Sequence, residues 1–412
     1  MPENRLHLLY FTAEQWPTFR PDVVALFGKY LPRYGITCDL VTERHLDEKG
    51  KPETPWGGGD AVLCNVPRNR VGKHLLKFWH NLRVLVTMDA KKYDAIQVRD
   101  MLLTALAGFI AARLKGIPFF YWLSYPHSEG QIESANIKGI RGGLRFWFLL
   151  GQGSLGLWLL YRIVLPRADH VFVQSRQMQL DVAKWGIPMA KMTPVPMGVD
   201  MEAVNPETIQ RVDDRQLEGK RVVAYLGTLV QIRRIDVLFE MLAQIKRQIP
   251  NIMLVLIGDS EDDAHRDWLK QEAVRMGVES DVLWTGWLPS DNAWRYMRAA
   301  EIGLSPIPRG YLLDMGSPTK AVEYMALGLP VVGNDNPDQM ELIEQSGAGI
   351  CVPLQSGAFA EVVIGLLKDP ELMQQMGVKG REYVAGKRDY DSIANALSEV
   401  YLNIGKPRLE VE

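Results

Sequence analysis

The chain has 412 residues, of which 47% are hydrophobic and 23% are charged, and its formal net charge is -2. This length is more than one hydrophobic core commonly serves, so we expect two domains, and the composition excludes a disordered or fibrous protein. The near balance of acidic and basic residues argues against a dedicated nucleic-acid binder.

The cysteines and the first residues bear on the compartment. Cys38, Cys64 and Cys351 are odd in number and widely scattered, which is typical of core thiols and not of a disulfide framework or a zinc site. Residues 1–6 are not followed by an apolar signal region. We therefore expect a reducing, cytoplasmic location.

Short β-rich runs alternate with helical patterns along the first half of the chain, which is typical of parallel α/β sheets. A helix is predicted over residues 100–115, ending at Gly116 with Pro118 just beyond. The predicted strands are residues 6–10, 61–66, 95–98, 119–123 and 170–174.

Residues 146–161 depart from this soluble pattern, because sixteen uncharged residues stand between Arg145 and Arg162. A spanning helix needs about 20 apolar residues, and this run is shorter and holds polar residues and glycines. Its aromatic edges favour a segment in contact with a membrane interface. A buried core helix is the alternative.

The second half repeats the strand and helix alternation more regularly, and a polar stretch over residues 206–220 is the expected linker. We predict an N-terminal domain over residues 1–205, a C-terminal domain over 206–388, and a final helical segment over 389–412 that crosses back to the first domain. The predicted strands are residues 222–226, 252–257, 282–285, 302–305 and 331–333.

The predicted fold class is α/β, with two Rossmann-like doubly wound domains facing a central cleft. Ligands of such sheets bind beside the carboxyl ends of the strands. Residues that follow those strands are therefore the first candidates for a site.

The most informative stretch runs from Asp314 to Val332. Ser317 followed by Pro318 predicts a helix start, with a hydroxyl N-cap and a proline in the first turn. The free backbone N–H groups and the dipole of such a helix attract an anion. Lys320 lies in the first turn, where it opposes the dipole but suits a bound diphosphate.

Glu323 lies one turn further along the same predicted helix, about 6 Å deeper along its axis than Thr319. Its carboxylate is suited to accept hydrogen bonds from the two hydroxyls of a ribose. The alternative is that Lys320 and Glu323 form only a local ion pair on the helix surface.

This stretch resembles the donor-site signature of the family 4 retaining glycosyltransferases, which have the GT-B fold. Their pattern has two glutamates eight positions apart, a helix end of small residues and a Pro-Val-Val strand. The resemblance assigns Glu323 to the ribose. Met315 stands where the first glutamate is expected, and Asp314 is the nearest acidic substitute.

Other motifs of this chain are similar to those of the same family, in the same order. The turn from Val195 to Asp200 matches the end of the first domain, and the Gly227-Thr228 turn opens the second. Family members grip the diphosphate with an arginine and a lysine there. Thr228 replaces the arginine and Arg233 falls at the lysine, so the resemblance assigns the diphosphate to Arg233 and Lys320. The expected donor-binding residues are Glu323, Gly316, Ser317, Thr319, Asp314, Gly227, Thr228, Gly258, Trp287 and Leu288.

The resemblance also implies a first-domain histidine beside the donor sugar. His127 is the best placed, because it follows the predicted strand over residues 119–123. A solvent-facing loop histidine is the alternative. Arg99 and Asp100 follow another predicted strand and are candidates to meet the acceptor.

No metal and no other cofactor is expected. The only strict Asp-x-Asp is Asp389-Tyr390-Asp391, and capping of the last helix explains Asp391 better than metal binding.

The implied function is a metal-independent, retaining hexosyltransferase. It would move a sugar from a nucleotide diphosphate sugar, UDP-linked in preference to GDP-mannose, to a lipid-linked or polysaccharide acceptor in cell-surface glycan synthesis. Its expected place is the cytoplasm, peripheral at the inner face of the plasma membrane, with no nucleic-acid partner. The alternative is a catalytically weak GT-B partner protein that binds sugar nucleotides.

Overall fold

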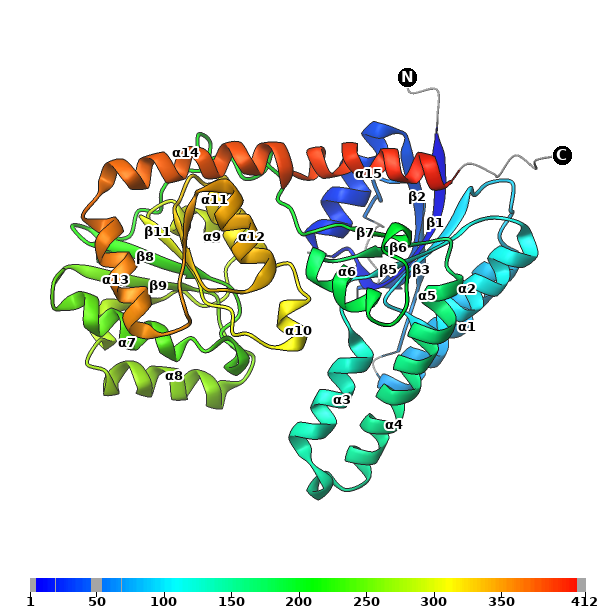
Figure 1. The fold of residues 1–412 in the computed structure, drawn as a ribbon, viewed down its shortest axis with the longest axis horizontal. Helices are drawn as coiled ribbons and strands as arrows, with labels where there is room; N and C mark the ends of the chain where they lie inside the picture. The colour runs from blue at the N-terminus through cyan, green and yellow to red at the C-terminus, as the bar shows by residue number, and fades with distance from the viewer. Residues whose placement is uncertain (1–4, 19, 46–53, 68, 406–412) are drawn as a thin grey trace. The chain divides into compact units, whose positions relative to one another are not determined.

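A computed structural model describes residues 5–18, 20–45, 54–67 and 69–405 (Figure 1). The chain forms two compact units. The first consists of Met1–Pro196 with Tyr390–Glu412, and the second of Met197–Asp389. The units therefore change at residues 196/197 and 389/390, whereas the sequence predicted boundaries at 205/206 and 388/389.

The first unit is built on a parallel sheet with the strand order β3-β2-β1-β4-β5-β6-β7 in the described part of the chain. The five strands predicted in this half are present. The sequence missed β2, which pairs with β1 and β3, and β7, which pairs with β6. The bounds are β1 Leu6–Trp16, β2 Ile36–Arg44, β3 Ala61–Cys64, β4 Ala95–Arg99, β5 Phe119–Leu123, β6 His170–Val173 and β7 Met192–Pro194.

Helices lie between these strands, and α2 (Leu102–Lys115) ends at Gly116 as predicted. The loop expected after residue 123 holds a helix instead, α3, which forms a hairpin with α4 (Figure 1). The other bounds are η1 Asp22–Tyr30, η2 Leu31–Tyr34, α1 Arg70–Thr87, α3 His127–Lys138, η4 Ile140–Gly142, α4 Leu144–Leu159, η5 Leu160–Val164, α5 Leu165–Arg167, α6 Arg176–Ala183 and η6 Met189–Lys191.

The last helix, α15 (Tyr390–Ile404), belongs to the first unit. Its apolar face joins the core beneath η1 and β1, and the hydroxyl of Tyr401 donates to the side chain of Gln97 on β4 at 2.5 Å. Asp391 lies inside the first turn and pairs with Arg33 at 3.7 Å, so it is not the N-cap that the sequence predicted.

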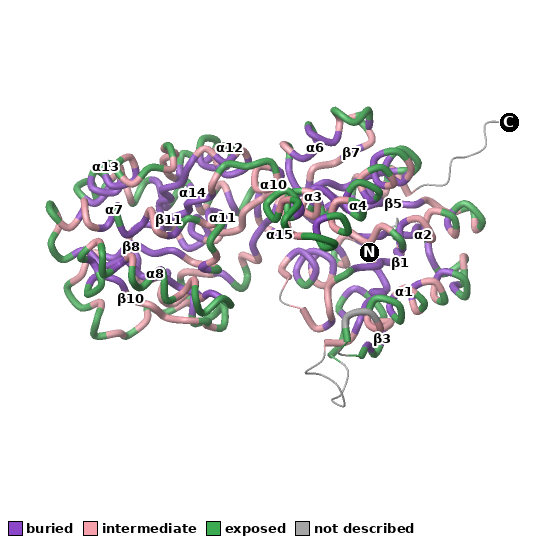
Figure 2. Tube along the Cα trace, turned by 90° about the horizontal axis from the view of Figure 1, so that it is seen from below, coloured by how far each residue is buried: buried purple, intermediate pink, exposed green. Residues whose placement is uncertain are grey.

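The second unit has a parallel sheet with the order β10-β9-β8-β11-β12-β13. All five strands predicted there are present, and β13 was missed. The buried residues concentrate in the strands of both units (Figure 2). The bounds are β8 Arg221–Leu226, β9 Ile252–Ile257, β10 Val282–Trp284, β11 Ile302–Ser305, β12 Val331–Gly333 and β13 Gly349–Cys351.

The helices of the second unit connect these parallel strands and supply the rest of its core. The predicted linker lies within this unit and is mostly irregular. The bounds are η7 Arg215–Leu217, η8 Gln231–Arg233, α7 Asp236–Lys246, α8 Asp263–Arg275, η9 Glu279–Asp281, α9 Ser290–Met297, α10 Tyr311–Asp314, α11 Thr319–Ala326, α12 Pro337–Ser346, α13 Ser356–Leu367 and α14 Pro370–Lys387.

Two parallel, doubly wound sheets with flanking helices make the predicted fold class correct. The three cysteines are free thiols, with Cys38 and Cys64 buried and Cys351 partly exposed. Burial raises the pKa of the Cys38 and Cys64 thiols, so neither is poised to react.

Candidate functional site

Two glycines line the carboxyl edge of the second sheet, directly after neighbouring strands. Gly227 follows β8 with φ +143°, and Gly258 follows β9 with φ +129°. A Cβ on Gly258 would lie 2.2 Å from the carbonyl oxygen of Gly227. Only glycine fits such a close backbone approach, so the two loops pack backbone to backbone at this edge, with Gly258 buried and Gly227 partly exposed.

Lys320, in the first turn of α11, lies against this edge. A Cβ on Gly227 would be 2.6 Å from the Lys320 Cε, and the Lys320 Nζ is 5.4 Å from the centroid of the Tyr225 ring. Removal from water, and then the charge of Arg233, lower the pKa of Lys320 to about 7, while Glu323 acts in the opposite direction. Burial and the neighbouring Arg233 therefore disfavour the charged form of the Lys320 amine.

Arg233 is the second cation at this edge, at the end of η8. Its side chain is half-buried, and its buried Nε has no hydrogen-bond partner among the described residues. Two neighbouring cations that lack a carboxylate partner form a strong anion site. Arg234 instead pairs with Asp236 at 2.8 Å and is exposed.

Glu323 lies one turn along α11 from Lys320. Burial raises the pKa of Glu323 to about 7, and the charge of Lys320 limits the rise. No ion pair within 4.0 Å joins Lys320 to Glu323 in the described part of the chain, although other i,i+3 pairs do form there. The local surface pair considered from the sequence is therefore not formed.

Ser317 does not cap α11 as predicted. The helix begins at Thr319 after Pro318 in the N-cap position, with no side-chain cap. The Ser317 hydroxyl accepts from the backbone N–H of Met197 at 2.9 Å and donates to Asp338 at 2.7 Å. Because Met197 and Asp338 engage this hydroxyl, it does not cap the helix.

Gly316 and Asp314 belong to the loop that leads into α11. Asp314 ends α10 and pairs with Arg309 at 2.9 Å, and the N–H of Gly316 donates to Leu313 at 3.3 Å. Met315, at the position of the expected glutamate, is fully buried. Asp314 is therefore engaged inside its own loop.

Three more predicted donor residues lie on loops at the same edge of the second sheet. Thr228 is exposed, and its carbonyl oxygen accepts from the Tyr225 hydroxyl at 3.1 Å. Trp287 is exposed, while Leu288 packs against the core. The Gly286 carbonyl accepts from the N–H of Gly258 at 3.1 Å, which ties the Trp287 loop to the glycine edge.

The first unit has its own pocket of about 270 Å³ at the carboxyl edge of its sheet. His127, the first residue of α3, lines this pocket, and its ring centroid is 4.9 Å from that of Tyr125. The His127 side chain is exposed. The other lining residues are Thr12, Ala13, Glu14, Arg20, Arg99, Asp100, Ser124 and Tyr125.

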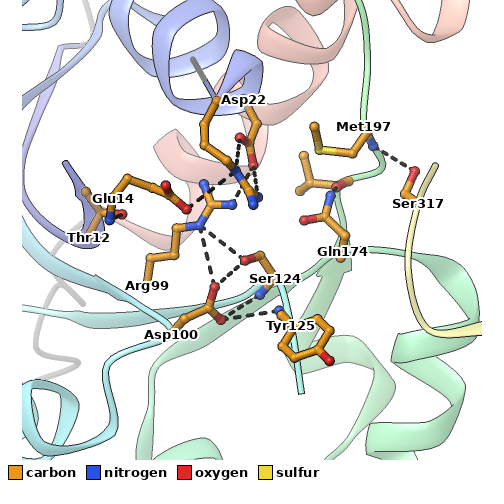
Figure 3. A network of polar contacts seen from close by, with 12 residues as sticks. Thr12, Glu14, Asp22, Arg99, Asp100, Ser124, Tyr125, Gln174, Met197 and Ser317 are labelled. Carbon is orange, nitrogen blue, oxygen red and sulfur yellow. Dashed lines mark hydrogen bonds and ion pairs between the residues drawn. The ribbon is translucent and has the colours of Figure 1, made fainter. Parts of the chain in front are cut away.

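An ion-pair and hydrogen-bond network joins several of these lining residues to Asp22 (Figure 3). Arg99, 1% exposed, bonds to Asp22 at 2.7 Å and to the Ser124 hydroxyl at 3.3 Å, and its buried Nη1 has no partner among the described residues. Asp100, at φ +54°, accepts from Ser124. The sequence missed Asp22, 77 residues from Arg99, since no local signal marks so distant a partner.

The N-terminal border of the pocket is the end of β1. The strand predicted over residues 6–10 continues to Trp16, with an irregular register between Phe11 and Gln15. The hydroxyl of Thr12 accepts from the N–H of Glu14 at 3.3 Å. The border is thus a distorted strand.

In the described residues, no group of three or more His, Cys, Asp or Glu side chains is placed to hold a metal ion. Asp389 of the Asp-x-Asp accepts from the N–H of Met201 at 3.3 Å.

Sequence families match both units. The Glycosyl transferases group 1 family matches residues 207–383, and the Glycosyl transferase 4-like domain matches residues 15–198.

Curated relatives are mannosyltransferases and similar enzymes. A GDP-mannose-dependent alpha-(1-6)-phosphatidylinositol monomannoside mannosyltransferase of Mycobacterium tuberculosis is 27% identical over 234 residues, which are 55% of this chain and 60% of the relative. An alpha-D-kanosaminyltransferase of Streptomyces kanamyceticus is 26% identical over 50% of this chain and 51% of its own length. These matches thus span less than two thirds of the relatives.

Solved structures match the whole fold. Sucrose-phosphate synthase from Thermosynechococcus elongatus has a TM-score of 0.72 at 18% identity, over 97% of this chain and 99% of that one. A glycosyltransferase from Rickettsia africae has a TM-score of 0.70 at 14% identity, over 98% and 99%. With both units matched by sequence families and this fold, the chain belongs to the group 1, family 4 glycosyltransferases of the GT-B fold.

Proposed function

We propose that the chain is a retaining hexosyltransferase that moves a sugar from a nucleotide diphosphate sugar to a lipid-linked or polysaccharide acceptor. One observation carries the proposal. Lys320 and Arg233 lie near each other beside Gly227, and neither forms an ion pair with an acidic side chain among the described residues.

The chemistry follows from the leaving group. As the bond between the sugar and the diphosphate breaks, negative charge grows on the departing oxygen. Cations and helix N–H groups placed there stabilise the transition state more than the ground state. Lys320, Arg233 and the N–H groups at the start of α11 supply this charge, and Glu323 accepts from the ribose hydroxyls.

Retention would follow if the departing diphosphate takes the proton of the acceptor hydroxyl on the same face of the sugar. This route needs no protein nucleophile and no metal. His127, on the exposed rim of the first-unit pocket, would then contact the donor sugar or the acceptor.

The named relatives bear on the donor. The mannosyltransferases are described as GDP-mannose-dependent and act on phosphatidylinositol mannoside. GDP-mannose is therefore tested beside UDP-sugars, which the sequence alone favoured. A lipid acceptor also suits a cytoplasmic enzyme held peripherally at the inner face of the plasma membrane.

The second candidate is a partner protein that binds sugar nucleotides without turnover. Met315 supports it, because a fully buried methionine occupies the place of the first family glutamate. Donor binding with neither transfer nor slow donor hydrolysis would favour this candidate.

The test combines binding and turnover. Thermal shifts with GDP, GDP-mannose, UDP and UDP-glucose identify the nucleotide, since a ligand at 100 times its Kd stabilises by about 2.7 kcal/mol. Transfer to a phosphatidylinositol mannoside is then followed, and the anomeric configuration of the product tests retention. Lys320→Ala should lose binding while Lys270→Ala, an exposed lysine on α8, should not. Equal binding by both variants would refute the proposed donor site.

A further inference from the structure

The hairpin of α3 and α4 extends beyond the sheet of the first unit (Figure 1). Its tip, residues 137–148, joins the end of α3 through η4 to the start of α4. Five large apolar side chains there are exposed: Ile137 at 80%, Ile140 at 74%, Leu144 at 89%, Trp147 at 60% and Phe148 at 66%. Such a cluster of exposed apolar side chains marks an interaction surface.

The charge of the hairpin tip has one sign. No acidic residue occurs from Ser134 to Ala168. Within the tip, Lys138, Arg141 and Arg145 are all exposed. Basic residues interleaved with large apolar ones complement an anionic lipid surface, where headgroups take the cations and acyl chains the apolar side chains.

The packing of the hairpin is close and fixes its two helices together. A Cβ on Gly153 would lie 2.7 Å from Ile132, and one on Gly156 would lie 2.6 Å from the Ser128 hydroxyl. At the base, Tyr161 donates to the buried Glu129 at 2.6 Å. Pulling α4 away from α3 would expose that carboxylate, so the hairpin moves as one body.

The α4–η5–α5 helix, Leu144–Arg167, is long and apolar enough to cross a membrane, and 33% of its most apolar window is buried. The topology opposes a crossing. The chain enters the hairpin from β5 and leaves it to β6, and these strands pair in one sheet. The outgoing helix α3 has 12 residues and is about 18 Å long, which is too short to cross about 30 Å of hydrocarbon.

We propose that the hairpin tip, residues 137–148, inserts end-on into the surface of an anionic bilayer and holds the first unit there. This proposal deepens the proposed peripheral location and rests on it. It narrows the membrane contact expected over residues 146–161 to the part of that segment at the tip, because Gly153 and Gly156 further along it are buried against α3.

The hairpin also fixes the height of the pocket of the first unit. His127 lines the pocket and begins α3, one helix length of about 18 Å from the tip. With the tip buried by about 5–10 Å, the pocket stands roughly 8–13 Å above the headgroups. An acceptor with a polar head that extends from the lipid, such as a glycosylated headgroup, matches this height.

Vesicle sedimentation tests the surface with the full chain. Vesicles of equal parts phosphatidylcholine and phosphatidylglycerol should bind the protein, and phosphatidylcholine alone should bind it weakly. The triple variant Leu144→Ser, Trp147→Ser, Phe148→Ser should lower affinity at least about 100-fold. Replacing Lys138, Arg141 and Arg145 with glutamine should lower it about 100-fold, with a reduced dependence on salt.

Matched controls lie elsewhere on the chain. Ile110→Ser with Leu114→Ser removes two exposed apolar side chains from α2, and Trp79→Ser removes one from α1. Both should bind vesicles as the wild type does. Loss of binding in a control with retention in the tip variants would overturn the proposal.

A labelled cysteine separates end-on insertion from a flat helix. In a Cys351→Ser background, an environment-sensitive dye at Leu144→Cys should shift to shorter wavelength on anionic vesicles, while one at Leu155→Cys should not. Residue 155 is 11 positions further along the helix, about 16 Å from residue 144. Equal shifts at both positions would refute end-on insertion.

The failures of the two proposals are distinguishable. If the wild-type protein does not bind anionic vesicles, both the peripheral location and the proposed role of the tip are refuted. Wild-type binding that the tip variants retain overturns the tip alone. Nucleotide affinity in the absence of vesicles should be unchanged in every tip variant, and its loss would show that the hairpin acts on the donor site instead.

Discussion

Asp338 and Arg388 form a buried ion pair at the end of the second unit, with the Arg388 Nη2 2.9 Å from the Asp338 Oδ1. Arg388 also donates to the Met197 carbonyl at 3.2 Å, and the other Asp338 oxygen accepts from Ser317. The pair thus fastens both ends of the second unit to the loop that precedes α11.

Removing one partner of this pair should destabilise the second unit strongly. Asp338→Ala leaves a buried guanidinium unpaired, which costs about 3–5 kcal/mol. Urea unfolding followed by tryptophan fluorescence measures the change. Asp335→Asn, which loosens an exposed pair with Arg309, is the control and should cost less than about 1 kcal/mol. Similar losses of unfolding free energy in the two variants would show that the buried pair does not stabilise the second unit.

The sequence predicted strands well wherever their residues are uniformly apolar. It missed β2 because three polar residues, Asp39, Thr42 and Glu43, are buried in that strand. Asp39 is satisfied from afar by Lys92 at 2.6 Å and Tyr93 at 2.7 Å. A local sequence pattern does not reveal partners so distant in the chain, so the polar residues of β2 suggest a loop.

The candidate site likewise has residues that local motifs predict and contacts that only the tertiary fold creates. Lys320, Glu323 and Gly227 follow from local motifs, because a helix start and a strand end set their positions. The partners of Ser317 do not, since Met197 and Asp338 are 120 and 21 residues away. The Arg99–Asp22 pair likewise depends on the tertiary fold alone.

Gly227→Ala should abolish nucleotide binding. Its Cβ would lie 2.6 Å from the Lys320 Cε, and its φ of +143° is unfavourable for alanine. Gly277→Ala is the matched control, since Gly277 also has positive φ but no neighbour within 4 Å of its Cβ. Calorimetric titration of GDP and UDP into both folded variants checks this. Normal affinity in Gly227→Ala would place the diphosphate elsewhere.

Nucleotide affinity should fall as the pH rises above about 7. The Lys320 ammonium exists below its pKa of about 7, and a bound diphosphate favours that charged form. The contribution of Lys320 to the affinity is therefore fullest below this pKa and declines, by at most about tenfold per pH unit, as the proton is lost. Titrations between about pH 7 and 9 measure the slope.

Lys320→Arg is the control for this pH dependence, because arginine stays charged throughout that range. Its affinity should be nearly flat with pH, apart from a contribution from Glu323, whose pKa is raised to about 7. An unchanged slope in Lys320→Arg would assign the titration to another group.

Chelation should leave transfer intact. Lys320 and Arg233 are proposed to neutralise the leaving group, so no divalent ion is needed. Transfer rates with and without EDTA are compared, with an excess of donor. Abolished transfer that a divalent ion restores would move the charge stabilisation from these two cations to a metal.

Three substitutions together test the donor site most sharply. In the proposed donor site, Lys320 and Arg233 each form charge-assisted hydrogen bonds with the diphosphate, worth about 1.5–3 kcal/mol. Alanine at either position should then lower kcat/KM by roughly 10- to 150-fold, since about 1.4 kcal/mol is a factor of ten. Much of the loss should fall on kcat, because charge on the leaving group grows toward the transition state.

Glu323→Gln keeps the shape of the side chain but weakens its acceptance from the ribose hydroxyls. The substitution should lower the affinity for the donor and for the free nucleotide to the same extent and leave kcat nearly unchanged. A site of another kind predicts normal kinetics in all three variants, with stability changes of a few tenths of a kcal/mol, as for a surface pair on a helix. Wild-type nucleotide affinity and turnover in folded Lys320→Ala and Glu323→Gln would therefore remove this donor site, and with it the proposed hexosyl transfer.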